Sequence, residues 1–351
     1  MQTDVRAQRR DLGRRVARRH SAAALIAAAA TAGTACHDAV NVTAPTPPAL
    51  NVSSNGTWLV NSLADPGDGM CTNSECTLRE AIAGAQDGDR IGFKGNLSGT
   101  IPLTAGTLII DKNLTIEGPG PNVLTVNGQG ASTVFQIGAD APVGLAILSG
   151  LTITGGQGTQ GGGIKVLPAA RLTLIGSMVV SNSAQQGGGI YGTGNMTLVG
   201  STIATNVATN EGGGIWSGGV LTISGSTISG NRVLQSQGGG IKVVCFTFCG
   251  LGASIRSSTI TRNEAPGGGG GVIILTPTTV MNTIIAGNTE NGDPAAQTAD
   301  CWITSFMTSL GYNLSTSNTG CSLPSPIASA VWPCFFRLFW TNRAKRGRCP
   351  S

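Results

Sequence analysis

The chain has 351 residues, enough for one large or two ordinary domains, but only 11% of them are charged, against about 25% in soluble domains. Glycine fills 53 positions and proline 16, without the Gly-X-Y period of collagen. The net charge of +5 comes from the two arginine- and lysine-rich ends. The body between them is net acidic, so we expect no nucleic-acid partner.

Residues 1–36 have the layout of a secretory signal peptide: an arginine-rich start, an alanine-dominated apolar segment at 22–30, and small residues up to Cys36. The apolar segment is too short for a permanent transmembrane helix. Cleavage has two interpretations, because residues 30–32 fit ordinary signal peptidase, whereas residues 33–36 resemble a bacterial lipobox that would lipidate Cys36. We therefore expect an extracellular or cell-surface protein, associated with the outer membrane only through such an anchor.

Two further segments lie outside the predicted fold. Residues 37–56 contain three prolines and are predicted to be a flexible linker. Residues 325–351 are an atypical tail, rich in aromatic and basic residues and lacking the Gly/Thr/Asn pattern upstream; we expect it to be disordered. Two interpretations of the tail remain, a membrane-surface or sorting segment and an altered reading frame.

Nine cysteines in an exported chain indicate disulfides. Cys36 and the two tail cysteines are set aside, and closeness in sequence pairs the other six as Cys71–Cys76, Cys245–Cys249 and Cys301–Cys321. Zinc is the alternative, but the spacings match no zinc finger and both histidines precede residue 57. We expect no metal site and no cofactor.

A repeat organises residues 96–324. Gly-Gly-Gly followed by an aliphatic residue begins at residues 161, 187, 212, 238 and 269, with spacings of 26, 25, 26 and 31 residues. A second signal is an asparagine that ends a Ser/Thr-rich strand, at Asn182, Asn206, Asn231, Asn263 and Asn288. Short alternating segments such as Leu221-Thr-Ile223 are typical of strands with one buried face. Together these signals predict an all-β fold, a right-handed parallel β-helix of about ten coils.

Both repeated signals have predicted structural roles. The glycines would supply corner φ values that other residues avoid, and the asparagines would stack from coil to coil and exchange amide hydrogen bonds. The open end of such a solenoid needs a cap. Residues 57–95 supply it, because Thr77-Leu-Arg-Glu80 is a capping box that predicts a short helix at 78–85, tied down by the Cys71–Cys76 pair.

The motifs of this cap carry a resemblance. Residues 61–69, Asn-Ser-Leu-Ala-Asp-Pro-Gly-Asp-Gly, and residues 76–82, Cys-Thr-Leu-Arg-Glu-Ala-Ile, resemble the CSLREA domain of bacterial surface proteins, with Thr77 in place of serine. The Gly-Gly-Gly-Ile and Asn signals are similar to the repeats of chlamydial polymorphic outer membrane proteins, without their Phe. The resemblance covers about residues 57–324. It implies a secreted or surface-exposed β-helix, in some relatives an adhesin, and no catalytic residue.

The number and position of the acidic residues indicate whether the chain can cleave a polysaccharide. Glycoside hydrolysis needs two carboxylates facing one bond, and lyase chemistry needs a base and usually a calcium site. Residues 145–300 contain no histidine and only five acids, Glu211, Glu264, Glu290, Asp293 and Asp300. Glu211 and Glu264 precede glycine runs, where solvated turns are expected. We therefore predict no catalytic residue.

One stripe of residues predicts ligand binding. If the aliphatic residue after each glycine triplet points inward, the next residue points outward, and these positions hold Lys165, Tyr191, Trp216 and Lys242. Aromatic rings flanked by lysines suit an anionic glycan or polymer. The alternative is that these side chains pack against neighbouring turns.

The sequence thus predicts an exported, monomeric β-helix for adhesion or polysaccharide binding, whose partner is a polysaccharide or another surface polymer. The alternatives are a polysaccharide lyase or glycoside hydrolase of the pectin-lyase-like type, and a purely structural envelope protein.

Overall fold

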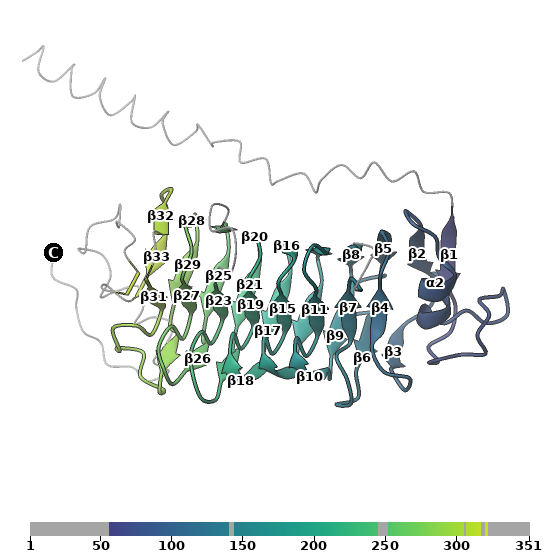
Figure 1. Cartoon of the computed structure of the whole chain (residues 1–351), viewed down its shortest axis with the longest axis horizontal. Coiled ribbons are helices and arrows are strands. Elements are labelled where there is room, and N and C mark those ends of the chain that lie inside the picture. The colour runs from purple at the N-terminus through teal and green to yellow at the C-terminus, as the bar shows by residue number, and fades with distance from the viewer. Residues whose placement is uncertain (1–55, 140–143, 245–251, 305–306, 317–319, 322–351) are drawn as a thin grey trace, which may run out of the picture. The chain divides into compact units, whose positions relative to one another are not determined.

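The structure, a computed structural model, describes residues 56–139, 144–244, 252–304, 307–316 and 320–321. It confirms the predicted right-handed parallel β-helix, with about eight turns where the repeat predicts about ten. The strands form four parallel sheets of ten, nine, eight and six strands, here named sheets A, B, C and D. Figure 1 shows the strands stacked in chain order along the long axis.

The strands of each sheet come from successive coils. Sheet A contains β1 (Thr57–Val60), β2 (Arg90–Phe93), β5 (Leu114–Glu117), β8 (Leu145–Ser149), β12 (Arg171–Ile175), β16 (Asn195–Val199), β20 (Leu221–Ser224), β24 (Ala253–Arg256), β28 (Thr278–Met281) and β32 (Met307–Ser309). Sheet B contains β3 (Gly99–Pro102), β6 (Leu124–Asn127), β9 (Thr152–Thr154), β13 (Met178–Val180), β17 (Thr202–Ala204), β21 (Thr227–Ser229), β25 (Thr259–Thr261), β29 (Ile284–Ala286) and β33 (Leu314–Ser315). Sheet C contains β4 (Leu108–Ile110), β7 (Phe135–Ile137), β11 (Ile164–Val166), β15 (Ile190–Gly192), β19 (Ile215–Ser217), β23 (Ile241–Val243), β27 (Val272–Ile274) and β31 (Cys301–Ile303). Sheet D contains β10 (Gln157–Gln160), β14 (Ser183–Gln186), β18 (Val207–Glu211), β22 (Arg232–Val233), β26 (Glu264–Ala265) and β30 (Thr289–Glu290).

The core follows from alternation along each strand. In β20, Leu221 and Ile223 are fully buried, whereas Thr222 between them is half-buried. The same inward positions in successive coils lie directly above one another, as in the pairing of Leu221 with Met196 and of Ile223 with Leu198. Aliphatic side chains therefore form one continuous core along the solenoid.

The predicted asparagine ladder is confirmed. Each buried asparagine donates its side-chain amide to the Oδ1 of the asparagine one coil further on, over 2.9 to 3.0 Å, from Asn182 through Asn206, Asn231 and Asn263 to Asn288. The same amide also donates to a backbone carbonyl of the preceding coil, as Asn206 Nδ2 does to Val179 O over 2.9 Å. Because every buried amide group is paired, the ladder fixes the position of each coil against the next.

The glycine triplets act in two ways, of which the sequence predicted one. In Gly187–Gly189, only Gly187 has a left-handed φ, at 62°. The other two glycines are required by close contact, because a Cβ on Gly188 would lie 2.4 Å from Val207 O and one on Gly189 would lie 2.8 Å from the Asn206 amide nitrogen. The triplet and the asparagine therefore recur together because one packs against the other.

A second buried ladder was not predicted. The backbone N–H of Ser177 donates to the hydroxyl oxygen of Ser201, and the pattern continues through Ser226 and Ser258 to Thr283 over 3.1 to 3.4 Å. These residues precede the strands of sheet B, whereas the asparagines follow them. A polar ladder therefore runs along each of the two ends of the strands of sheet B.

The N-terminal cap is built as predicted. Helix α2 (Leu78–Gly84) begins after Thr77, whose side chain accepts from the Glu80 N–H while the Glu80 carboxylate accepts from the Thr77 N–H. The Cys71–Cys76 disulfide is present. Figure 1 shows α2 at the N-terminal end of the stack. The cap strands β1 and β2 also continue sheet A, since β2 pairs with β5.

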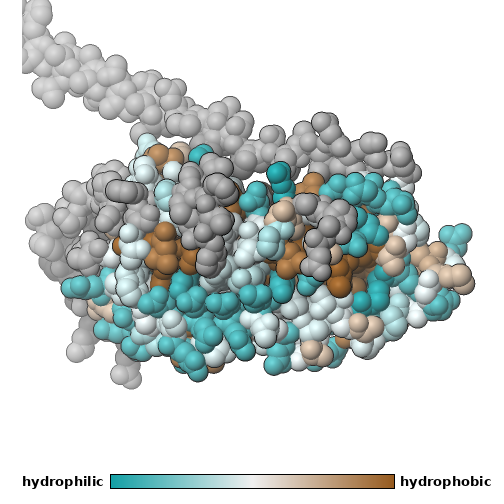
Figure 2. Space-filling model, viewed as in Figure 1, coloured by the Kyte–Doolittle hydropathy of each residue, from teal (hydrophilic) through white to brown (hydrophobic). Residues whose placement is uncertain are grey.

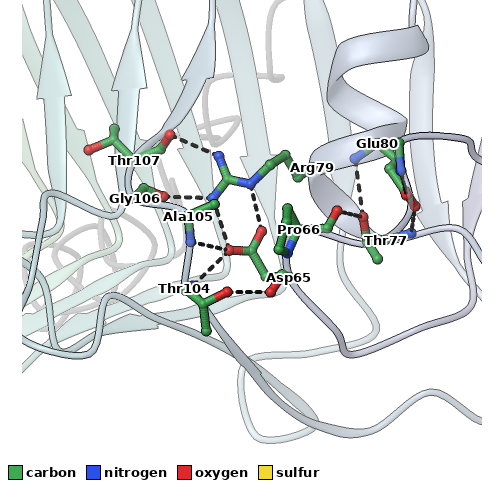
Figure 3. Close-up of polar contacts among 10 residues, drawn as sticks. Asp65, Pro66, Thr77, Arg79, Glu80, Thr104, Ala105, Gly106 and Thr107 are labelled. Atoms are coloured by element: carbon green, nitrogen blue, oxygen red, sulfur yellow. Dashed lines mark hydrogen bonds and ion pairs between the residues drawn. The ribbon is translucent and has the colours of Figure 1, made fainter.

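A buried ion pair joins this cap to the first coil (Figure 3). The Arg79 guanidinium lies 2.6 Å from Asp65 Oδ1 and also donates to Gly106 O over 2.7 Å. Asp65 Oδ2 accepts from the N–H groups of Thr104 and Ala105 over 2.7 and 2.9 Å. Burial opposes ionisation of Asp65, but the bonds from Arg79 and these backbone groups outweigh it and lower the pKa. Asp65 is thus a structural carboxylate.

The other end is closed by Asp300 and a disulfide. Asp300 takes the next position of the asparagine ladder, accepting the Asn288 amide over 2.9 Å and the Thr316 N–H over 2.9 Å. The predicted Cys301–Cys321 disulfide is present beside it. The predicted pair Cys245–Cys249, the candidate lipidation site Cys36 and the segments 1–36, 37–55 and 325–351 lie outside the described residues. Among the described residues, no helix has the length and apolarity needed to cross a membrane.

We predict that the cap is destabilised by acid. The pKa values of Asp65, Glu80 and Asp89 are all lowered. These carboxylates therefore stabilise the fold above the unfolded pKa of about 4, and the stabilisation is lost as the pH falls through their folded pKa values. Thermal unfolding followed by circular dichroism between pH 7 and pH 3 should show the melting temperature falling at the acid end.

Asp65→Asn should lower stability at pH 7 by about 2 kcal/mol, because Arg79 loses its charged partner, and should flatten the pH dependence. Asp293→Asn is the matched control, since Asp293 lies exposed in a loop near the other end, and should cost less than about 0.5 kcal/mol. An Asp65→Asn melting curve identical to that of the wild type at pH 7 would contradict the structural role of the ion pair.

Candidate functional site

The four residues of the predicted stripe do lie side by side on sheet C. Lys165 pairs with Tyr191, Tyr191 with Trp216, and Trp216 with Lys242, in consecutive strands. The rings of Tyr191 and Trp216 stack with centroids 4.5 Å apart and planes 11° from parallel. The register of the glycine repeat therefore predicted this arrangement correctly.

Three of the four residues of the stripe are buried rather than exposed to solvent. Tyr191, Trp216 and Lys242 are only 7%, 3% and 6% exposed, and Lys165 alone is half-buried. Burial raises the pKa of the Tyr191 hydroxyl. The geometry therefore agrees with the alternative interpretation, in which these side chains pack within the fold. The ligand-binding role of the stripe stays a prediction.

Glu211 is the residue that organises this stripe. It ends β18 rather than lying in the expected solvated turn, and its carboxylate accepts from Trp216 Nε1 over 3.1 Å and from Lys242 Nζ over 2.6 Å. The Lys242 side chain is 7% exposed and that of Glu211 is 26% exposed. A lysine so deeply buried needs a charged partner. Glu211 thus stabilises two coils at the corner between sheets D and C.

A different surface offers room for a ligand. An open groove of about 560 Å³ crosses β10, β14 and β18 of sheet D, a volume within the range of small-ligand sites. Its polar lining comes from Gln157, Thr159, Ser183, Gln185 and Thr209, with glycines and alanines between them. Gln157, Thr159 and Gln185 are exposed, and none of the described residues that line the groove is charged. Uncharged hydrogen-bonding groups thus gather on the outer face of sheet D.

The view in Figure 2 agrees with this placement. Hydrophilic side chains gather along the lower edge of the solenoid, where Figure 1 labels β10, β18 and β26 of sheet D. The groove was not predicted, because its signal in the sequence is weak. The segments 157–160, 183–186 and 207–210, which lie just before three of the glycine triplets, each carry two or three Gln, Ser, Thr or Asn residues, but only the parallel register places them side by side.

The acidic residues of the coils are held by structural contacts. Glu264 pairs with Arg232 over 3.3 Å rather than lying alone in a turn. Glu290 accepts from the Thr298 hydroxyl, and Asp293 accepts from the Ala295 N–H over 2.8 Å. Asp300 and Glu211 have the partners described above. Among the described residues, no three His, Cys, Asp or Glu side chains form a group that could hold a metal ion.

Comparisons with protein-family models, with curated proteins and with solved structures find no match. The resemblance to CSLREA-domain proteins therefore stays a prediction from the motifs of the cap.

We predict that Glu211→Ala destabilises the protein by about 2 kcal/mol, because it leaves the buried ammonium of Lys242 and the Trp216 N–H without their partner. Glu264→Ala is the matched control. It removes a glutamate from the same part of the repeat, but its pair with Arg232 is exposed, so the cost should be below about 1 kcal/mol. Urea unfolding midpoints measure both changes, and equal shifts would contradict the buried role of Glu211.

Proposed function

We propose that the chain is an exported, monomeric cell-surface β-helix that binds a neutral polysaccharide in the groove of sheet D, without cleaving it. The observation that carries the proposal is the groove itself, which combines exposed Gln157 and Gln185 amides with the Thr159 and Thr209 hydroxyls. Amides and hydroxyls both donate and accept hydrogen bonds, as the hydroxyl groups of a sugar require. A neutral ligand suits a groove without charged lining.

Export is supported by two independent features. The Cys71–Cys76 and Cys301–Cys321 disulfides are typical of proteins that fold in an oxidising compartment. The first 36 residues carry the charge and apolarity pattern of a signal peptide. We propose that Cys36 is the point of lipid attachment at the outer membrane if cleavage occurs before it.

Binding without cleavage is favoured by the partners of the acidic residues. A glycosidase needs one carboxylate to protonate the leaving group and a second to act on the sugar or water. Glu211, the acid at the end of β18, is held by Lys242 and Trp216 and does not line the groove. The lyase or hydrolase alternative predicts released oligosaccharides, and the purely structural alternative predicts no ligand.

Affinity electrophoresis of the purified chain in gels that contain neutral or acidic polysaccharides tests the proposal, with released oligosaccharides measured in parallel. Retention by a neutral polysaccharide without release is expected. Gln185→Ala with Thr209→Ala should weaken retention about thirtyfold, since each of the two lost hydrogen bonds costs about 1 kcal/mol.

Gln86→Ala, an exposed glutamine of the cap, is the matched control and should bind as the wild type does. If the polysaccharide still retains the groove variant as strongly as the wild type, the groove is not the binding site. Oligosaccharide release would replace the proposal with the enzyme alternative, and the absence of retention on every polymer would leave the structural one.

A further inference from the structure

Sheet B differs from the other faces in its regularity. From β9 to β25 the middle residue of each three-residue strand is buried, such as Ile203, Ile228 and Ile260 at 0% exposure, and the residues on either side are half-exposed. In β29 the pattern ends, because Ile284 is exposed and Ala286 is buried. The outward residues form two ranks. The first rank is Thr125, Thr152, Met178, Thr202, Thr227 and Thr259, and the second rank is Asn127, Thr154, Val180, Ala204, Ser229 and Thr261.

These ranks form a two-dimensional lattice. Adjacent strands lie about 4.8 Å apart, and residues two apart along a strand lie about 6.7 Å apart. The pairing runs from β6 to β25 without a register shift. The serine and asparagine ladders fix the sheet at both edges from β13 to β25. The outward groups are therefore held at fixed spacings in both directions.

The chemistry of this face is neutral. The nine strands of sheet B contain no Asp, Glu, Lys or Arg; Arg262 follows β25 in the turn, outside both ranks. Sheet A differs, because it carries Arg171 and Arg256 at exposed positions. Among the described contacts, the hydroxyls of Thr202, Thr227 and Thr259 make no hydrogen bond to protein, so they remain available to solvent.

Such a face fits ordered water better than a soluble solute. A lattice of neutral hydroxyl and methyl groups offers no charge for an ion. The hydroxyls of Thr202, Thr227 and Thr259 can each donate to and accept from one water, while the neighbouring methyl groups restrict where that water lies. The Thr152 hydroxyl instead donates to Pro121 O. The two spacings are close to the repeats of oxygen atoms on a prism face of hexagonal ice. A rigid array can hold such waters without an entropic cost of ordering its own side chains.

We propose that the two ranks of sheet B bind ice. The ligand is the surface of a growing ice crystal, and the central positions Thr202, Thr227 and Thr259 lie at the middle of the contact. This site is on a different face from the polysaccharide groove and does not depend on it.

Ice shaping, thermal hysteresis and inhibition of ice recrystallisation by the purified full-length chain test the proposal. The wild type should shape ice crystals and slow recrystallisation. Thr227→Lys should lose both effects, because a long charged side chain at the centre holds the lattice away from a flat crystal. Thr222→Lys is the matched control, since Thr222 is a half-buried, outward threonine of sheet A in the same coil, and should keep them.

Circular dichroism and melting curves would establish that both lysine variants fold. Because Gln185→Ala with Thr209→Ala changes only the groove, it should leave ice binding intact, which separates the two sites. A wild-type chain with no effect on ice, or an equal loss in both lysine variants, would overturn the proposal. Adsorption to crystalline cellulose or chitin instead of ice, lost in Thr227→Lys, would also overturn it in favour of a solid polymer.

Discussion

The buried asparagine ladder is the constraint on which the rest of the structure depends. A coil of about 25 residues cannot bury its apolar face alone, so it is stable only when stacked in register on its neighbours. A buried amide that lost its partner would cost about 1–3 kcal/mol, and a slip of any coil would break several such bonds together. The ladder from Asn182 to Asn288 therefore converts a stack of short strands into one rigid body. The glycine triplets are needed because they let the next segment pack against these amides.

Because each added coil stabilises the ladder, the stack needs a cap at each end to stop further coils from adding. At the N-terminal end α2 covers the stack, and the buried pair of Asp65 with Arg79 attaches the cap to the first coil. At the other end Asp300 replaces asparagine, and its carboxylate can only accept hydrogen bonds, which suits a position where donors come from both Asn288 and Thr316. The disulfide at Cys301 holds the chain beside this position. Both ends thus use carboxylates with structural partners.

The rigid stack gives the four sheets different chemistry. On sheet C the aromatic pair and Lys242 are buried with Glu211. On sheet D, amides and hydroxyls line an open groove, and on sheet B small neutral groups form a lattice. The two proposed ligands, a soluble neutral polysaccharide and an ice surface, follow from the difference between a concave groove and a flat face. In both cases the scaffold supplies fixed positions and the outward residues supply the chemistry.

The sequence by itself determined the fold, the cap and the register, because these depend on local signals that repeat: the glycine triplet, the strand-ending asparagine, and the capping box at Thr77. It also determined that Lys165, Tyr191, Trp216 and Lys242 share one line. Only the tertiary structure decided which outward positions are buried. Buried Trp216 and Lys242 both donate to Glu211, which lies at the end of a strand in a neighbouring sheet, and the sequence does not show that these three residues meet. The groove and the serine ladder were missed for the same reason. Their residues are ordinary Gln, Thr and Ser in each coil, and they acquire meaning only when parallel pairing places them side by side.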